Sequence, residues 1–207
     1  YTTRPSVYTK NAASNYPVNV YSMPLSAVTN ITTDNGSLGS QKIQFSYENL
    51  KIHVNGRGML GFSNMTRDNT TIGEKQTTAV TEMNSTYWAP AKVVLNYIVG
   101  GKTSSVITTS RTEKVGNNYF TYESKKEATD YDGNKVITET YYDLDKGVVT
   151  DQIVMTNGAD MYKETIYDGF VKKGNTWLPT IVTLTQQHPD DEDVYESVTI
   201  YTYDSKG

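Results

Sequence analysis

The residues of this chain that could carry out acid–base, nucleophilic or metal chemistry are few and scattered. The 207 residues include two His and no Cys, which excludes disulfides, thiol catalysis, iron–sulfur clusters and Cys-type zinc sites. His53 lies in strand-like sequence and His188 precedes a proline in a turn. Neither has a nucleophile motif such as G-x-S-x-G beside it. We therefore expect no catalytic residue, no bound metal and no cofactor, and predict that the chain is not an enzyme.

The densest group of carboxylates is the run DDED at residues 190–193. Carboxylate oxygens are the ligands that Ca²⁺ prefers, but the run lacks the alternating, Gly-containing spacing of an EF-hand loop. It lies between two strand-forming segments, which favours solvated charge at the tip of a hairpin. Paired carboxylates in a cleft could hydrolyse glycosides, but no local motif singles out such a pair.

Charge and hydropathy exclude two further classes of protein. The formal net charge is −4, whereas a nucleic-acid-binding domain carries a basic stripe. No apolar run approaches the roughly 18–20 residues that span a bilayer. We therefore expect neither a nucleic-acid partner nor a membrane span.

Composition and turn signals together predict the fold class. The chain has 17 Tyr and many Thr, Val and Ile, which are the residues that favour strands. A mean hydropathy of −0.56 fits antiparallel strands with one solvated face. Turn signals recur about every 11–16 residues in the second half, at positions 100–101, 117–118, 132–134, 145–147, 157–158 and 173–175. This punctuation predicts an all-β antiparallel meander of hairpins that forms a strongly twisted, curved or partly closed sheet.

No linker or low-complexity block divides the chain, so we predict a single all-β domain over residues 1–207. Residues 1–16 are polar and contain Pro5, and we expect them to form a loose N-terminal arm or an edge segment. A boundary near residues 84–90 is the alternative division.

Residues 194–203 predict how the last strand is built. Period two places Val194, Val198 and Ile200 on one face, which we expect to point into the core. The other face carries Tyr195, Ser197, Thr199, Tyr201 and Tyr203. An edge strand of this composition is poorly protected against pairing. We expect it to associate with another chain, or to close the sheet against residues 18–28.

A glycine-rich stretch at residues 45–62, FSYENLKIHVNGRGMLGF, is the most distinctive motif. Its glycines indicate tight turns and close backbone approach, and no Gly-Lys-Ser/Thr follows to make a phosphate loop. The stretch resembles the "Y-x-Y-…-G-R-G-F-L-G-F" segment of bacterial Rhs/YD-repeat proteins and of the related toxin-complex shell proteins. The matching positions are Tyr47, Gly56, Arg57, Gly58, Gly61 and Phe62, whereas Phe45 and Met59 depart from the pattern.

Tyr-Asp pairs carry the rest of the resemblance. The last of them matches the repeat core "Y-x-Y-D-x-x-G" of this family, and their spacings of 11, 25 and 36 residues are typical of the degenerate region upstream of its regular repeats. From the residues alone, we expect Asp to cap the turn backbone and Gly to supply a positive φ. The pairs are Tyr131-Asp132-Gly133, Tyr142-Asp143, Tyr167-Asp168-Gly169 and Tyr203-Asp204, the last followed by Gly207.

The resemblance implies a function as well as a fold. Members of the family are secreted or held at the bacterial cell surface, and their stacked hairpins form shells or wall-associated, adhesive scaffolds. The aspartates that cleave these proteins have no counterpart here, so no catalytic residue is carried over. We therefore expect a structural scaffold segment whose partners are the rest of a longer chain or neighbouring repeats. The alternative is a cell-surface module whose Tyr/Thr face binds a glycan or an apolar ligand.

Overall fold

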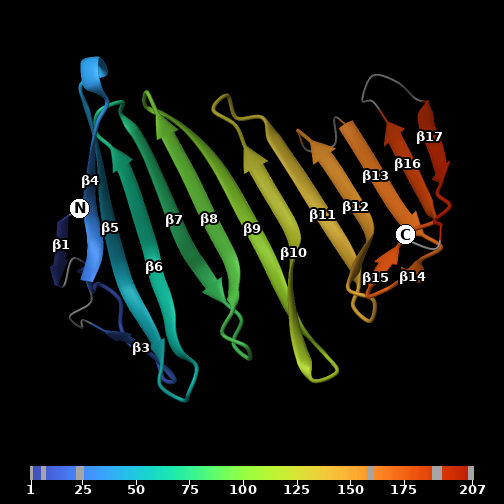
Figure 1. Cartoon of the computed structure of the whole chain (residues 1–207), viewed down its shortest axis with the longest axis horizontal. Coiled ribbons are helices and arrows are strands. Elements are labelled where there is room, and N and C mark those ends of the chain that lie inside the picture. The colour runs from blue at the N-terminus through green and yellow to red at the C-terminus, as the bar shows by residue number, and fades with distance from the viewer. Residues whose placement is uncertain (1, 6–7, 22–25, 158–160, 188–192, 205–207) are drawn as a thin grey trace. The chain divides into compact units, whose positions relative to one another are not determined.

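The computed structural model describes residues 2–5, 8–21, 26–157, 161–187 and 193–204. Strands account for 73% of the described residues and helix for 1%, which confirms the predicted all-β antiparallel meander (Figure 1). The helix is a single 3₁₀ turn, η1 (Gly36–Leu38). Within the described ranges, no helix has the length and apolar character needed to cross a membrane.

The chain divides into two compact units, Tyr1–Ile107 and Thr108–Gly207. The division falls within strand β9 (Lys102–Val115), so this strand contributes to both units. Residues 84–90, the alternative boundary, instead contain a turn inside the first unit, where Asn84 Oδ1 accepts hydrogen bonds from the amides of Thr86 and Tyr87. The single domain over residues 1–207 remains a prediction.

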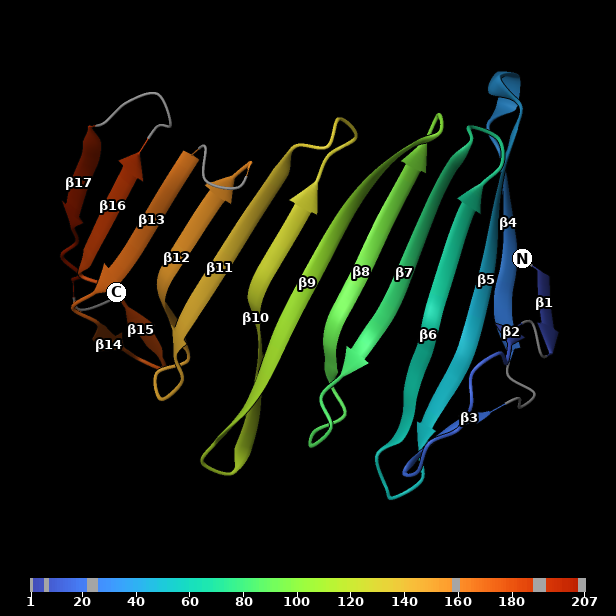
Figure 2. The same cartoon turned by 180° about the vertical axis from the view of Figure 1, so that it is seen from behind.

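The first unit is an antiparallel meander with extra strands on β5. Strands β4 to β8 pair in chain order, β1 adds to β4, and both β2 and β3 add to β5. The strands lie side by side in both views (Figure 1 and Figure 2). Their bounds are β1 (Thr2–Pro5), β2 (Tyr8–Thr9), β3 (Val18–Tyr21), β4 (Ser26–Asp34), β5 (Ser40–His53), β6 (Gly58–Asn69), β7 (Glu74–Met83) and β8 (Pro90–Val99).

The described residues of the N-terminal segment pair with the sheet, as an edge segment would, and do not form a loose arm. Strand β2 pairs with β5 in parallel. The buried side chain of Asn49 then accepts hydrogen bonds from the backbone amides of Asn11 and Ala12, each at 2.9 Å. A buried amide oxygen must find a donor, and here the donors come from the N-terminal segment.

The second unit continues the meander to the last strand. The order is β9–β10–β11–β12–β13–β16–β17, and β14 pairs with β15 in a separate two-stranded sheet. The bounds are β10 (Asn118–Thr129), β11 (Lys135–Asp143), β12 (Val148–Thr156), β13 (Met161–Asp168), β14 (Val171–Lys173), β15 (Thr176–Leu178), β16 (Ile181–Gln187) and β17 (Val194–Ile200).

The last strand differs from its prediction in two respects. It pairs with β16, whereas Val18–Tyr21 pairs with β5, so the expected closure against residues 18–28 is wrong. The face expected to point into the core is open, because Val198 is 52% exposed and Ile200 is 74% exposed. Alternation correctly places these side chains on one face, but no element among the described residues covers that face.

A single layer of strands makes up each unit. In the described part of the chain, the element contacts of any extent join hydrogen-bonded neighbours, and no second sheet or helix packs on a face. Few described residues are buried, and all of them lie in the first unit: Val20, Asn49, Leu50, His53 and Asn69.

Three glycines shape the connection between β5 and β6. Gly56, Gly58 and Gly61 have φ of 93°, 72° and 94°. Gly61 lies at a bulge, where the register between β5 and β6 shifts after Lys51. A Cβ at Gly61 would meet no heavy atom within 4 Å, so its requirement for glycine comes from backbone conformation alone.

We expect Gly61→Ala to lower the free energy of unfolding by about 1 kcal/mol or more, because L-residues rarely adopt this φ. Urea denaturation followed by circular dichroism measures the change. Ser63→Ala, on the same strand, is the control and should unfold like wild type. Equal stability of the Gly61→Ala variant would show that the bulge relaxes without cost.

Candidate functional site

The candidate site is a cleft in the second unit, where strands β10 and β11 separate. Their ladder runs from Thr129↔Lys135 to Lys125↔Glu139 and ends there, and the two ribbons diverge beyond this point (Figure 1). A cleft of about 380 Å³ opens between them. Its lining residues are Thr109, Arg111, Tyr122, Ser124, Lys125, Glu139, Thr140, Tyr141 and Tyr142.

The two strands separate because each follows its other neighbour. The N-terminal half of β10 is held to β9 by side-chain contacts. Ser124 Oγ donates a hydrogen bond to the carbonyl of Thr109 at 3.2 Å, and the hydroxyls of Thr112 and Thr121 lie 3.0 Å apart. The C-terminal half of β11 pairs with β12. A register shift there, between Tyr141 and its neighbour Tyr142, increases the local twist.

Two tyrosine rings line the cleft, Tyr122 from β10 and Tyr142 from β11, and Phe120 contacts both of them. The ring centroids of Tyr122 and Tyr142 are 4.6 Å apart across the opening, and Phe120 lies 5.6 Å from Tyr122 and 5.9 Å from Tyr142. Antiparallel pairing that sets Thr112 against Thr121 also sets Arg111 beside Tyr122. Aromatic and cationic side chains therefore line the same part of the opening.

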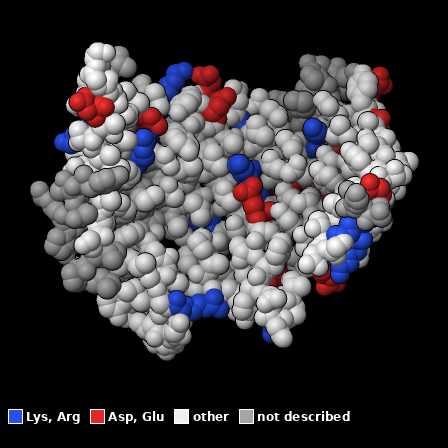
Figure 3. All heavy atoms as spheres, viewed as in Figure 1, with Lys and Arg blue, Asp and Glu red and all other residues white. Residues whose placement is uncertain are grey.

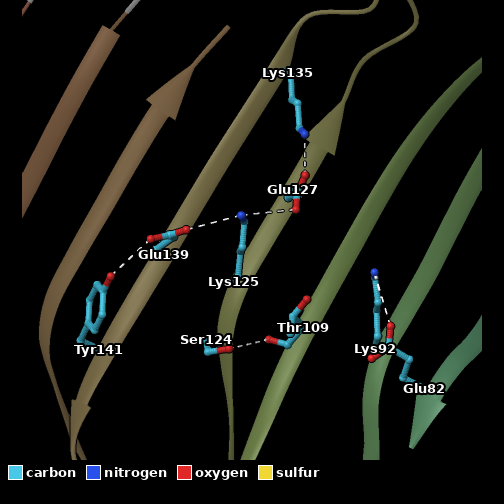
Figure 4. A network of polar contacts seen from close by, with 9 residues as sticks. All are labelled: Glu82, Lys92, Thr109, Ser124, Lys125, Glu127, Lys135, Glu139 and Tyr141. Atoms are coloured by element: carbon cyan, nitrogen blue, oxygen red, sulfur yellow. Dashed lines mark hydrogen bonds and ion pairs between the residues drawn. The ribbon is translucent and has the colours of Figure 1, made fainter. Parts of the chain in front are cut away.

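Above the cleft, a chain of ion pairs joins β10 and β11 (Figure 4). Glu127 lies 2.5 Å from Lys135 Nζ and 3.5 Å from Lys125 Nζ. Lys125 also lies 3.5 Å from Glu139, whose second oxygen accepts a hydrogen bond from the Tyr141 hydroxyl at 3.3 Å. Figure 3 shows acidic and basic side chains next to one another on one face of the molecule.

This network sets the protonation of its members. The hydrogen bond from Lys135, aided by the charge of Lys125, holds the pKa of Glu127 below its ordinary value. The charge of Glu139 raises the pKa of the Tyr141 hydroxyl. At neutral pH, Glu127 is thus a fixed anion and Tyr141 a neutral hydrogen-bond donor.

Arg111 is the one cleft cation outside this network. Its side chain is exposed, and it forms no ion pair or hydrogen bond within the described residues. Its charge nevertheless reaches the Tyr141 hydroxyl, whose pKa it acts to lower, against the effect of Glu139. The guanidinium is therefore close to the opening and available to an anion.

Two carboxylates meet on the neighbouring strands. Asp151 on β12 and Glu164 on β13 are diagonal neighbours, because Asp151 pairs with Ile166 and Glu164 pairs with Ile153. Burial, together with the charge of Glu164, raises the pKa of Asp151. Asp151 Oδ1 is buried and has no hydrogen-bond partner. The sequence offered no local signal for this pair, since the two residues lie on separate strands.

The residues with metal or nucleophile chemistry lie apart. No group of three or more His, Cys, Asp or Glu that could hold a metal occurs in the ranges that the structure describes. His53 is 7% exposed and its ring centroid lies 5.1 Å from that of Trp88. His188 and most of the acidic run at 190–193 lie outside the described residues, with Asp193 as the exception.

The residues of the glycine-rich motif meet within the first unit. The rings of Tyr47 and Phe62 lie 5.0 Å apart on paired strands, and the Tyr47 hydroxyl donates to the carbonyl of Val28 at 3.0 Å. Arg57 Nη1 donates to the carbonyl of Tyr87 at 2.6 Å. These contacts join β4, β5, β6 and the β7–β8 turn, so the motif side chains hold strands and turns together.

The turn at Tyr131-Asp132-Gly133 departs from the expected capping. Asp130, not Asp132, accepts hydrogen bonds from the amides of Asp132 and Asn134, each at 2.9 Å. The Asn134 side chain also donates to Asp130, and these bonds hold the pKa of Asp130 below its ordinary value. Gly133 has a φ of 91°, as the turn requires, and Tyr131 is 41% exposed.

Two other Tyr-Asp pairs use their own carboxylate. Asp143 accepts from the amides of Asp145 and Lys146, each at 3.0 Å, and also pairs with the Lys146 ammonium. Asp168 accepts from the amide of Gly169 at 2.6 Å. The carboxylate at these positions satisfies turn amides that no strand partner reaches.

The last pair contacts the two-stranded sheet and its flank. The Tyr203 hydroxyl donates to the carbonyl of Pro179 at 2.6 Å. Lys173 Nζ donates to the carbonyl of Asp204 at 2.5 Å. Gly207 lies outside the described residues.

Two further hollows lie in the first unit. A broad depression over β5, β6 and β7 is lined by polar residues, among which Glu48 already accepts a hydrogen bond from Asn64 at 2.8 Å. A smaller hollow of about 340 Å³ lies beside Trp88 and is mainly apolar. The first also contains Asp68 and Lys75, and the second contains Lys51 beside Tyr16 and Trp88.

No protein-family model matches this chain, and the searches of curated proteins and of solved structures also gave no match.

Replacing Glu127 with Gln tests the network above the cleft. We expect a loss of about 0.5–1 kcal/mol in the free energy of unfolding at pH 7 and low salt, and a smaller loss in 1 M NaCl. Because the folded state lowers the pKa of Glu127, this stabilisation is present above its ordinary pKa of 4.5 and is lost as the pH falls below it. Glu123→Gln, an exposed site on the same strand, is the control, and equal effects of the two variants would contradict a specific network.

Asp151→Asn should raise the stability of the fold at pH 7, whereas Glu127→Gln should lower it. A pKa raised in the folded state means that ionised Asp151 destabilises the fold as the pH rises above its ordinary pKa of 3.8. We therefore expect the variant to raise the Tm at pH 7 by about 2 °C, and the gain to shrink toward pH 3. The exposed Asp145→Asn serves as the control in thermal melts across this range. A lower Tm for Asp151→Asn at pH 7 would show that the carboxylate is stabilising.

Proposed function

We propose that the chain is a non-enzymatic scaffold segment, a stretch of β-sheet wall in a longer secreted or cell-surface protein. The observation that carries this proposal is the last strand, β17, in which all seven residues are exposed. It pairs with β16 on one side, and no described strand lies on its other side. A sheet of this kind is completed by further strands.

The composition of β17 supports the same conclusion. Natural edge strands are protected by proline, bulges or several charges. Val194–Ile200 contains no proline, and Glu196 is its one charged residue. Its apolar row of Val194, Val198 and Ile200 is more than half exposed, as expected of a strand that a neighbour covers.

The residues of the two sequence motifs also support a structural role. Tyr47, Arg57 and Phe62 connect strands and turns, while Asp143 and Asp168 satisfy turn amides. Their resemblance to bacterial Rhs/YD-repeat proteins fits this use, because that family builds scaffolds from stacked hairpins. The partners would be the rest of a longer chain or neighbouring repeats, at the cell surface or outside the cell.

In the isolated chain, we expect the open edge of β17 to pair with a second copy. Sedimentation velocity should show concentration-dependent dimers, and hydrogen exchange at residues 194–200 should slow as the dimer forms. Thr199→Lys should weaken association about tenfold or more, since an edge lysine opposes strand addition.

Val136→Lys is the control, because Val136 is an exposed strand residue that already has a ladder partner on each side, Ala128 in β10 and Thr156 in β12. This variant should associate like wild type. A monomer whose residues 194–200 exchange rapidly at every concentration would overturn the proposal that this edge is a pairing surface.

A further inference from the structure

The cleft between β10 and β11 has features that a wall segment does not need. An unpaired guanidinium beside the point where the β10–β11 pairing ends forms no contact that stabilises the sheet. Arg111 is exposed and has no partner among the described side chains, while Tyr122 and Tyr142 face the same opening.

We propose that this cleft binds a carbohydrate that carries a carboxylate, with one uronic acid residue seated between the β10 and β11 walls. The apolar CH face of a pyranose packs against the aromatic rings of Tyr122 and Tyr142. Its carboxylate pairs with the planar guanidinium of Arg111, which matches a carboxylate in a two-pronged geometry.

The charges around the cleft favour an anionic ligand. Lys125 is held between Glu127 and Glu139, and Glu139 also accepts from Tyr141. These groups satisfy one another. The charge of Arg111 is the one left without a counter-ion, so a neutral sugar would leave it unmatched.

The size and lining of the cleft favour a sugar over an apolar ligand. Its volume of about 380 Å³ is at the small end of the roughly 300–1,000 Å³ of small-molecule sites. Typical sites of that size are lined mainly by apolar side chains, whereas this one adds the hydroxyls of Ser124 and Thr140 to its tyrosines. Hydroxyl groups at both walls can exchange hydrogen bonds with the ring hydroxyls of a sugar.

The test is an NMR titration of the ¹⁵N-labelled chain at a concentration where it is monomeric. The probes are methyl β-glucuronide, its neutral isostere methyl β-glucoside, and acetate, each over the millimolar range. We expect the glucuronide to shift amide signals of residues 109–111, 122–125 and 139–142, with an affinity at least tenfold above that of the glucoside. Equal shifts with acetate would reduce the site to an anion contact, and equal affinity for both glycosides would remove the role of the carboxylate; either result overturns the proposal.

Variants locate the interaction. Arg111→Gln should weaken glucuronide binding about tenfold or more and leave glucoside binding unchanged, as expected for the loss of a charged hydrogen bond. Lys126→Gln removes the same charge from an exposed position of β10 outside the cleft and should bind like wild type. Tyr142→Leu should weaken both glycosides.

Absence of any shift with the glucuronide, or undiminished binding by Arg111→Gln, would also overturn the proposal. The comparison of the two glycosides on wild-type protein does not depend on the folding of any variant. Failure here leaves the association through β17 untouched, so the binding proposal and the scaffold proposal are tested separately.

Discussion

Backbone hydrogen bonds between neighbouring strands are the interaction on which the rest of this chain depends. In most domains, these bonds are reinforced by a second layer that buries one face of the sheet. Here the described strands contact chiefly their ladder neighbours, and the second unit has no buried side chain among its described residues. Each ladder bond contributes about 0.5–1.5 kcal/mol and each cross-strand side-chain pair about 0.2–1 kcal/mol. Stability is therefore spread along the sheet and is not concentrated in a core.

When pairing carries the fold, register decides which side chains meet. The turns fix that register: Asp130 and Asp143 satisfy turn amides on either side of β11. A shift at Tyr141 and Tyr142 then alters the course of β11 relative to β10. The pairing of β10 with β11 ends at Lys125 and Glu139. Beyond that point the strands separate, the rings of Tyr122 and Tyr142 meet, and the guanidinium of Arg111 is exposed. Local turn chemistry thus determines where the two tyrosine rings and the guanidinium of Arg111 come together beside the cleft.

Much of the fold could be predicted because its signals are local. Alternating strand-forming residues between Gly, Asn and Asp turns predicted the antiparallel meander, and period two correctly grouped Val198 with Ile200. Alternation does not say whether another element covers a face, so the expected burial of that row was wrong. The attachment of the N-terminal segment through Asn49 was not predicted because this hydrogen-bond acceptor lies 37 and 38 residues away in sequence from its donors. The cleft had no sequence signal for the same reason: Arg111, Tyr122 and Tyr142 meet only through the registers of successive hairpins.

The scarcity of buried side chains also has a thermal consequence. The heat capacity change of unfolding grows with the apolar surface that unfolding exposes, and the single-layer sheet already leaves much of that surface in water. Its stability curve should therefore be flatter than that of a compact domain of equal length, with a shallow maximum and a weak dependence on temperature. A sheet built in this way should keep nearly the same free energy of unfolding over a wide range of temperature.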